Sequence, residues 1–75
     1  MKLDLHGHTV HSAWQVFNTR VTDAYYNNDK FVIVITGQGV IMHEFRAWAS
    51  QHPHVRSWSN NPHNPGSYKL SLKKG

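Results

Sequence analysis

Five consecutive apolar residues, Phe31 to Ile35, constrain the fold of this chain more than any other feature. All five are β-branched or aromatic, the residue types that favour strands. An apolar run without alternation is typical of a strand inside a sheet, where a parallel neighbour is the usual arrangement. The run therefore predicts an α/β fold in which residues 31–35 form a central strand.

Apolar residues at helical spacing precede and follow this strand. The first stripe lies within residues 10–25 and a shorter second stripe lies within residues 41–49. Thr9 or Ser12 can cap the first helix, and Pro53 ends the second because proline disfavours the α conformation in the residue before it. We expect the large aromatic residues of both stripes to lie in the core; these are Trp14, Phe17 and Trp48.

Three more strands are predicted from alternating or β-prone segments at residues 3–6, 55–59 and 68–73. Between the last two, residues 60–66 are rich in Asn and Pro and predict a loop of about seven residues. The element order is β-α-β-α-β-β. If successive strands add in one direction, right-handed crossovers place both helices on one face. We expect a single domain over residues 1–75, a two-layer sandwich with a four-stranded mixed sheet.

Alternation also assigns side chains to the two faces of this sheet. The face towards the helices should carry Leu3, Leu5, Val55, Ser57, Leu70 and Leu72. The open face should carry Asp4, His6, Arg56, Trp58, Lys69, Ser71 and Lys73. The open face is therefore predicted to be polar and basic.

Composition narrows the class of partner. The chain has 75 residues, no cysteine, eight Lys and Arg against four Asp and Glu, and seven His. The lack of cysteine excludes disulfides, thiolate zinc sites and cysteine nucleophiles. A small basic domain favours phosphate-bearing partners, with a merely solvated basic surface as the alternative. No segment has the length of a membrane span or the shape of a signal peptide, so we expect a cytoplasmic protein.

Glycine turns follow the first and second strands. Ligands of open α/β sheets bind beyond the carboxyl ends of parallel strands. Each turn also leads into a helix N-terminus, whose unpaired N–H groups attract anions. Although a single Gly-x-Gly is more often only a tight turn, the two turns together predict a phosphate cradle. Its residues are Gly7, His8, Thr36, Gly37, Gln38 and Gly39.

Asp4 and His6 lie two residues apart on a strand and so share a face. A carboxylate beside an imidazole can perform acid–base chemistry, orient a water or hold a metal. Alternatively, Asp4 only accepts a hydrogen bond from a nearby backbone N–H and fixes the turn. The spacing of His6, His8 and His11 also permits a zinc site, although such sites usually have a further close ligand.

Four more residues are candidates for contact with a phosphate: Arg56, Lys69 and Lys73 on the open face, and His43 near the start of the second helix. Trp58 could stack on an unpaired base among these cations, or simply pack against the last strand. The remaining histidines are expected to be solvated in loops; these are His52, His54 and His63.

The segments Leu3-Asp4-Leu5-His6-Gly7 and Thr36-Gly37-Gln38-Gly39 resemble the two motifs of the small MutS-related (Smr) domain family. The resemblance covers nearly the whole chain, including Trp48 and the segment His52 to Trp58. It implies a β-α-β-α-β-β sandwich similar to the C-terminal domain of translation initiation factor three. It also implies nicking or cleavage of nucleic acid, with Asp4 and His6 matching the cleavage motif and residues 36–39 the substrate-binding motif.

The chain departs from this family in two places. The family often has Gly-Gly-x-Gly before its last strand, where this chain has Pro65-Gly66-Ser67. Gln38 occupies a position where a basic residue is common. No second acidic residue lies near Asp4 in the sequence, so cleavage would use at most one metal ion, Mg²⁺ or Mn²⁺, or imidazole chemistry.

We therefore expect an endonuclease that acts on RNA or DNA. Asp4 would position or activate the nucleophile, and His6 would be its acid–base or orienting partner. An RNA- or DNA-binding module without catalysis is the alternative, and a histidine-based metal protein is a third possibility. We expect a monomer, alone or as part of a longer protein, with no membrane partner.

Overall fold

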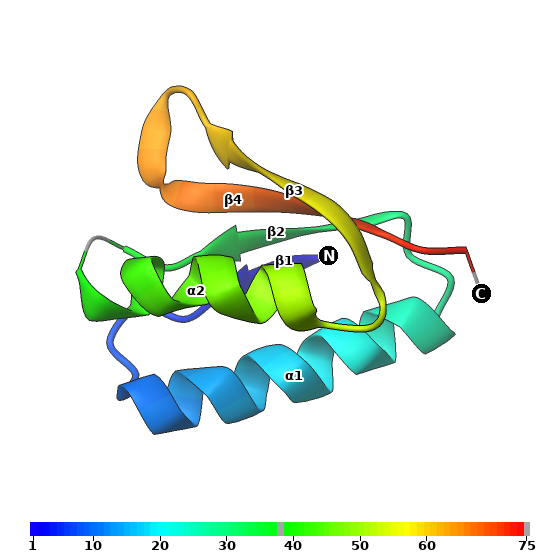
Figure 1. Ribbon diagram of the computed structural model, residues 1–75, viewed down its shortest axis with the longest axis horizontal. Coiled ribbons are helices and arrows are strands. Elements are labelled where there is room, and N and C mark those ends of the chain that lie inside the picture. Colours follow the sequence, from blue (N-terminus) through cyan, green and yellow to red (C-terminus); the bar gives the residue numbers. More distant parts are fainter. Residues whose placement is uncertain (38, 75) are drawn as a thin grey trace.

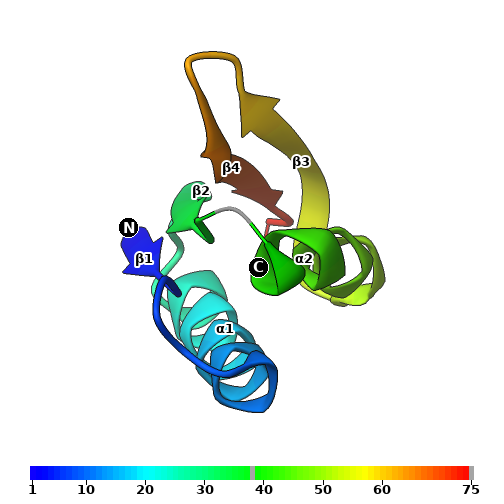
Figure 2. The same ribbon diagram turned by 90° about the vertical axis from the view of Figure 1, so that its left-hand side faces the viewer.

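The computed structural model describes residues 1–37 and 39–74. A four-stranded sheet is covered on one side by both helices (Figures 1 and 2). The elements are β1 (Lys2–Asp4), α1 (Val10–Tyr26), β2 (Phe31–Ile35), α2 (Val40–Gln51), β3 (Val55–Asn61) and β4 (Asn64–Leu72). The predicted two-layer β-α-β-α-β-β architecture is confirmed. Neither of these helices is long and apolar enough to cross a membrane.

The strands do not add to the sheet in chain order. β4 lies between β2 and β3, which gives the order β1-β2-β4-β3. β2 is parallel to β1 and antiparallel to β4, so it is the inner strand that its apolar run predicts. Because β3 is also antiparallel to β4, β2 and β3 run in the same direction without touching. The connection through α2 therefore passes over β4, and both helices still cover one face (Figure 2).

The core lies between this sheet and the helices. The rings of Phe17 and Phe45 meet edge to face with centroids 5.5 Å apart. Trp48 packs against the core as predicted. Trp14 does not, because 44% of its surface is exposed. The sheet contributes the four predicted leucines together with two β2 valines and one β3 valine; these are Leu3, Leu5, Leu70, Leu72, Val32, Val34 and Val55.

A β-bulge in β3 reverses the faces predicted for the residues that follow it. Val55 is buried as expected, but the pairing shifts between Val55 and Ser57, which makes Arg56 the extra residue. Ser57 is consequently exposed, and Trp58 turns towards the helices, where its ring meets Phe45 edge to face. The predicted faces of Ser57 and Trp58 were wrong because strict alternation makes no allowance for an extra residue.

The connection between β3 and β4 is a tight hairpin, not the predicted loop of about seven residues. Only Pro62 and His63 form the turn. Asn60 Nδ2 donates to two carbonyl oxygens of β4, each 3.1 Å away. Asn64 Oδ1 accepts a hydrogen bond of 3.1 Å from the N–H of Gly66. The asparagines that indicate a loop by composition here hold the base of a hairpin together.

Two of the three histidines expected in solvent are packed against aromatic rings. His52 is buried, 5.8 Å from Phe17 between ring centroids, and its Nδ1 accepts from the N–H of His54. The imidazole of His54 stacks on Tyr25 with centroids 3.8 Å apart. His63 is exposed in the hairpin turn, as predicted. The predictions for His52 and His54 were wrong because their loop folds back over the end of α1.

Burial makes His52 hard to protonate. Desolvation and the neighbouring His54 lower the pKa of His52 below its ordinary 6.5, with a smaller opposing effect from the main chain of Asn18. The main chain of Asn18 comes close enough to act on the ring, but no described residue forms a hydrogen bond of 3.5 Å or less with its buried Nε2. His52 is therefore a core residue whose neutral form is favoured by burial.

Candidate functional site

The two predicted glycine turns lie side by side where β1 and β2 end. The N–H of Leu5 donates to the carbonyl of Ile35 over 2.7 Å, which joins the two strand ends. The imidazole of His6 occupies the space beside Gly37, where a β-carbon would lie 3.1 Å from its Cδ2. Gly37 also has a φ of 68°, in the left-handed region. Position 37 therefore needs glycine both for its backbone and for the ring of His6.

A third segment, not predicted from the sequence to lie here, completes this arrangement. The carbonyl of Gly66 in β4 accepts from the N–H groups of Thr36 and Gly37 at 2.7 and 3.3 Å. Thr36 Oγ1 donates to the same carbonyl over 3.2 Å. A β-carbon on Gly66 would lie 3.0 Å from three backbone atoms of Gly37. The segment Pro65-Gly66-Ser67 was predicted to precede the last strand but lies within β4, and it keeps the glycine that allows this approach. That single glycine was the available signal.

Asp4 holds the first turn in shape. Its Oδ1 accepts from the N–H of His6 over 2.8 Å, which is the structural role considered for this residue. Asp4 and His6 are both exposed, so the carboxylate can accept further hydrogen bonds. A Mg²⁺ or Mn²⁺ ion would find the single carboxylate of Asp4 here, which fits the way Mg²⁺ binds one or two carboxylates together with substrate phosphates.

The zinc alternative is not supported by the positions of its histidines. Across the described parts of the chain, no three His, Asp or Glu residues come together as possible ligands. Nδ1 of His8 instead lies 3.0 Å from Oγ of Ser12. Thr9 caps α1, because its Oγ1 accepts from the N–H of Ser12 over 3.2 Å. His8 and Thr9 therefore organise the start of α1.

The second turn leads into α2 without a capping side chain. Gly39 is the N-cap residue and makes no side-chain hydrogen bond to the helix. His43 is exposed in the first turn of α2, and its N–H donates to the carbonyl of Gly39 over 3.1 Å. N–H groups of a first helical turn that lack a capping side chain attract anions. The prediction for Gln38 falls on a residue outside the described part of the chain.

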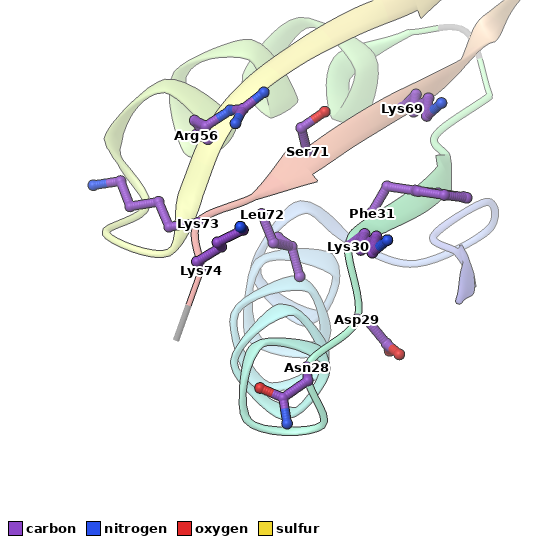
Figure 3. A pocket seen from close by; sticks show the side chains of 10 residues that line it. All are labelled: Asn28, Asp29, Lys30, Phe31, Arg56, Lys69, Ser71, Leu72, Lys73 and Lys74. Carbon is purple, nitrogen blue, oxygen red and sulfur yellow. The ribbon is translucent and has the colours of Figure 1, made fainter.

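We call this end of the sheet the turn site and define it by Asp4, His6, Thr36, Gly37 and Gly66. The predicted basic residues do not lie there. They line a groove of about 600 Å³ beside the start of β2 and the end of β4, at the opposite end of the sheet (Figure 3). We call it the basic groove; its lining includes Lys30, Phe31, Arg56, Lys69, Lys73 and Lys74.

The structure therefore divides the predicted site residues into two groups. Thr36 follows Phe31 by five positions along β2 and its following turn, which corresponds to about 17 Å at about 3.3 Å per strand residue. Trp58 belongs to neither group: its Nε1 donates to Oγ of Ser50 over 3.1 Å, so it packs between β3 and α2. Phe31 was missed as a site residue because its run predicted burial, yet it is 43% exposed.

This fold, with glycine turns ending its first two strands, defines a class of small α/β domains. A sequence profile of the Smr domain matches residues 3–68, and the chain belongs to the Smr domain family. The resemblance found in the sequence is confirmed. Members of this family are associated with nucleic-acid binding and nuclease activity.

Two solved structures share the fold. The Smr domain of Thermus thermophilus MutS2 is 19% identical, with a TM-score of 0.89 and 96% of each chain covered. YdaL, a stand-alone small MutS-related protein from Escherichia coli, is 18% identical with a TM-score of 0.89. The match covers 97% of the present chain and 64% of YdaL. A search of curated proteins finds no match.

Proposed function

We propose that this domain is an endonuclease that cleaves RNA or nicks DNA at the turn site. One observation carries the proposal: the imidazole of His6 and the carboxylate of Asp4 lie beside the turn in which Gly37 meets Gly66. Three chain segments thus meet beside an exposed carboxylate and an exposed imidazole. Membership of the Smr family supports a nucleic-acid substrate.

The chemistry follows from the groups at this end of the sheet. A substrate phosphate would be held by N–H groups of the first turn of α2 and of the turn at Gly7. Asp4 would orient the attacking hydroxyl or water through its carboxylate. An imidazole can take up or release a proton near neutral pH, so His6 would exchange the proton with the nucleophile or the leaving oxygen.

The second candidate is a nucleic-acid-binding module that does not cut. It is favoured by the hydrogen bond between Asp4 Oδ1 and the N–H of His6, because a carboxylate that fixes a turn needs no catalytic role. This candidate uses the same surfaces. It predicts binding that weakens as salt rises, without cleavage in any metal.

The variant Asp4→Asn separates the two candidates. An asparagine Oδ1 can still accept from the N–H of His6, so the turn and the binding of substrate are retained. Cleavage should fall by about 10²-fold or more, the usual contribution of a positioned acid or base. The assay incubates labelled single-stranded RNA, duplex RNA, single-stranded DNA and branched DNA with Mg²⁺, Mn²⁺ or EDTA at two salt concentrations.

Asp23→Asn is the matched control, because Asp23 is exposed in α1 and makes the same change of charge. The control should cut like the wild type. Undiminished cutting by Asp4→Asn would remove Asp4 from the mechanism. Tight binding by the wild type without cleavage of any substrate would establish the binding module. We also propose that the domain acts as a monomer, which light scattering during the assay would test.

A further inference from the structure

The basic groove concentrates the positive charge of the molecule. Five of the eight Lys and Arg residues line it, with Asp29 as the one acidic residue in its lining. The formal charge of the lining is therefore +4, equal to that of the whole chain. Gathering like charges destabilises a folded protein through repulsion, and a bound polyanion relieves it.

An exposed aromatic ring stands among these cations. Phe31 is 43% exposed at the start of β2, and Nζ of Lys69 lies 4.5 Å from the centre of its ring. Both side chains project into the same groove from neighbouring strands (Figure 3). On the far side of Ser71 from this pair, Arg56 comes from the start of β3 and Lys73 from just after β4 (Figure 3). A flat apolar surface thus lies within reach of several cations.

We infer that the basic groove is a second binding site, which holds a single-stranded segment of RNA or DNA. One base stacks on the ring of Phe31, and the adjoining phosphates pair with Lys69, Arg56 and Lys73. This inference rests on the proposed function for its class of substrate. It adds two points: the bound segment is single-stranded, and it binds at a place separate from the turn site.

The combination of groups favours this ligand over other polyanions. Proteins that bind single strands pair a cationic groove for the backbone with aromatic rings on which bases stack. A duplex keeps the faces of its bases inside the stack, where Phe31 cannot reach them. An acidic polypeptide would match the charge but offers no base to lie on the ring. Phe31 is therefore the residue that distinguishes the ligands.

The position of the groove also fits a strand that continues to the turn site. The separation of about 17 Å along β2 corresponds to about five nucleotides at about 3.4 Å per nucleotide of a stacked strand. A strand with one base on Phe31 could thus present a phosphate to His6 about five nucleotides away. The groove would hold the substrate while the turn site acts on it.

The test compares two labelled 12-nucleotide ligands by fluorescence anisotropy, thymidine oligonucleotide dT12 and an abasic strand with the same phosphates. The wild type should bind dT12 about tenfold more tightly, within the range for stacking of one base. Phe31→Leu should lose this preference, and Phe31→Tyr should keep it. Tyr26→Leu is the control, because Tyr26 is 71% exposed on α1 and lies outside the groove.

A second pair of variants tests the phosphate contacts. Lys73→Gln and Arg20→Gln each remove one positive charge, but Arg20 lies on α1 away from the groove. Lys73→Gln should lower the slope of log affinity against log salt by about 0.7, the value for one phosphate contact to a single strand. Arg20→Gln should leave the slope unchanged. Circular dichroism of all variants verifies that they are folded.

Several results would overturn the inference. The wild type could bind dT12 and the abasic strand with equal affinity, or Phe31→Leu could keep the full preference for dT12. The wild type could also bind a 12-base-pair duplex more tightly than dT12, or polyglutamate of equal charge could displace dT12. None of them touches the cleavage proposal, which depends on Asp4→Asn. Conversely, a wild type that prefers dT12 yet cuts nothing would sustain the groove and overturn the proposed cleavage.

Discussion

The two ends of the sheet are built from different parts of the chain. At the turn site, main-chain atoms make the contacts: the carbonyl of Gly66 accepts from two N–H groups, and Gly37 leaves room for His6. In the basic groove, long side chains supply the charge and Phe31 supplies a flat surface. Main-chain contacts fix a geometry closely, whereas long side chains adapt to ligands of varied sequence. The turn site therefore suits chemistry and the groove suits binding.

The strongest test of this contrast is Gly66→Ala. The new β-carbon would lie 3.0 Å from backbone atoms of Gly37, which cannot move aside alone. We expect a loss of about 2–3 kcal/mol in the free energy of unfolding, as for other overpacked sites, together with loss of cutting. Urea unfolding measures the stability.

Gly7→Ala is the control for crowding. A β-carbon there would meet nothing within 4 Å, although the φ of 86° is strained for alanine. Gly7→Ala should lower the free energy of unfolding by about 1–2 kcal/mol, because alanine is strained in the left-handed region. A loss in Gly66→Ala no larger than in Gly7→Ala would show that the contact between Gly66 and Gly37 is not what makes the turn site rigid.

A second test asks whether acid acts on the turn site or on the core. Because the pKa of His52 is lowered below 6.5 in the folded protein, the unfolded chain binds more protons in the window beneath that value. The contribution of neutral His52 to the free energy of unfolding is complete above about pH 6.5. It is lost as the pH falls through the pKa of His52 in the folded protein. The melting temperature of the wild type should therefore fall by several degrees from pH 7.5 to pH 5.

His52→Gln should flatten this dependence, and His63→Gln, in the exposed hairpin turn, should not. An unchanged slope in His52→Gln would assign the acid sensitivity to other groups. The outcome sets the pH range in which the turn site can be tested. A role of His6 in cutting has to be measured at a pH at which protonation of His52 does not yet destabilise the fold.

A smaller effect is expected at the middle of the sheet, between the two ends. The hydroxyl of Tyr68 is buried, and no described residue hydrogen-bonds to it. Tyr68→Phe should raise stability by about 1 kcal/mol, because it removes an unpaired polar group. Cutting and the preference for dT12 should stay as they are. A drop in stability would instead reveal a partner for the hydroxyl.

The smallest effect on stability should come from the groove. Lys73→Gln should change the free energy of unfolding by no more than about 0.5 kcal/mol, as is usual for exposed residues. Added salt should raise the melting temperature of the wild type more than that of the variant, since it screens repulsion among the cations. A large loss of stability in Lys73→Gln would mean that the groove, like the turn site, has a structural role.

Local patterns were sufficient for the parts of the fold that depend on neighbouring residues. The run Phe31–Ile35 is a strand with the predicted bounds, and the helix predicted within 10–25 spans Val10–Tyr26. The meeting of the two turns was also predictable, because parallel neighbouring strands end at the same edge of a sheet. The turn site could thus be anticipated in all but Gly66.

The basic groove could be anticipated only in part. The open face with Arg56, Lys69 and Lys73 was predicted from alternation, but the place of Phe31 among these cations depends on pairing between distant segments. Phe31 and Lys69 become neighbours only when β4 inserts beside β2, and no local pattern specifies that order. One extra residue at Arg56 likewise turned Trp58 to the other face. The burial of His52 depends on how the loop after α2 packs against α1. These features follow from packing of the whole chain, which periodicity does not encode.

The hydrogen bond between the terminal amine of Met1 and the carbonyl of Phe31 has a practical consequence. It places the first residue 3.5 Å from the strand that floors the groove, and Lys74 lines the same groove from the other terminus. The start of β1 and the end of β4 both lie away from the glycine turns (Figure 1). A dye joined before Met1 would therefore start beside the main chain of Phe31, at the end of the sheet that carries the groove. Such a dye would report the binding that we infer for the groove, whereas a bulky tag would hinder it.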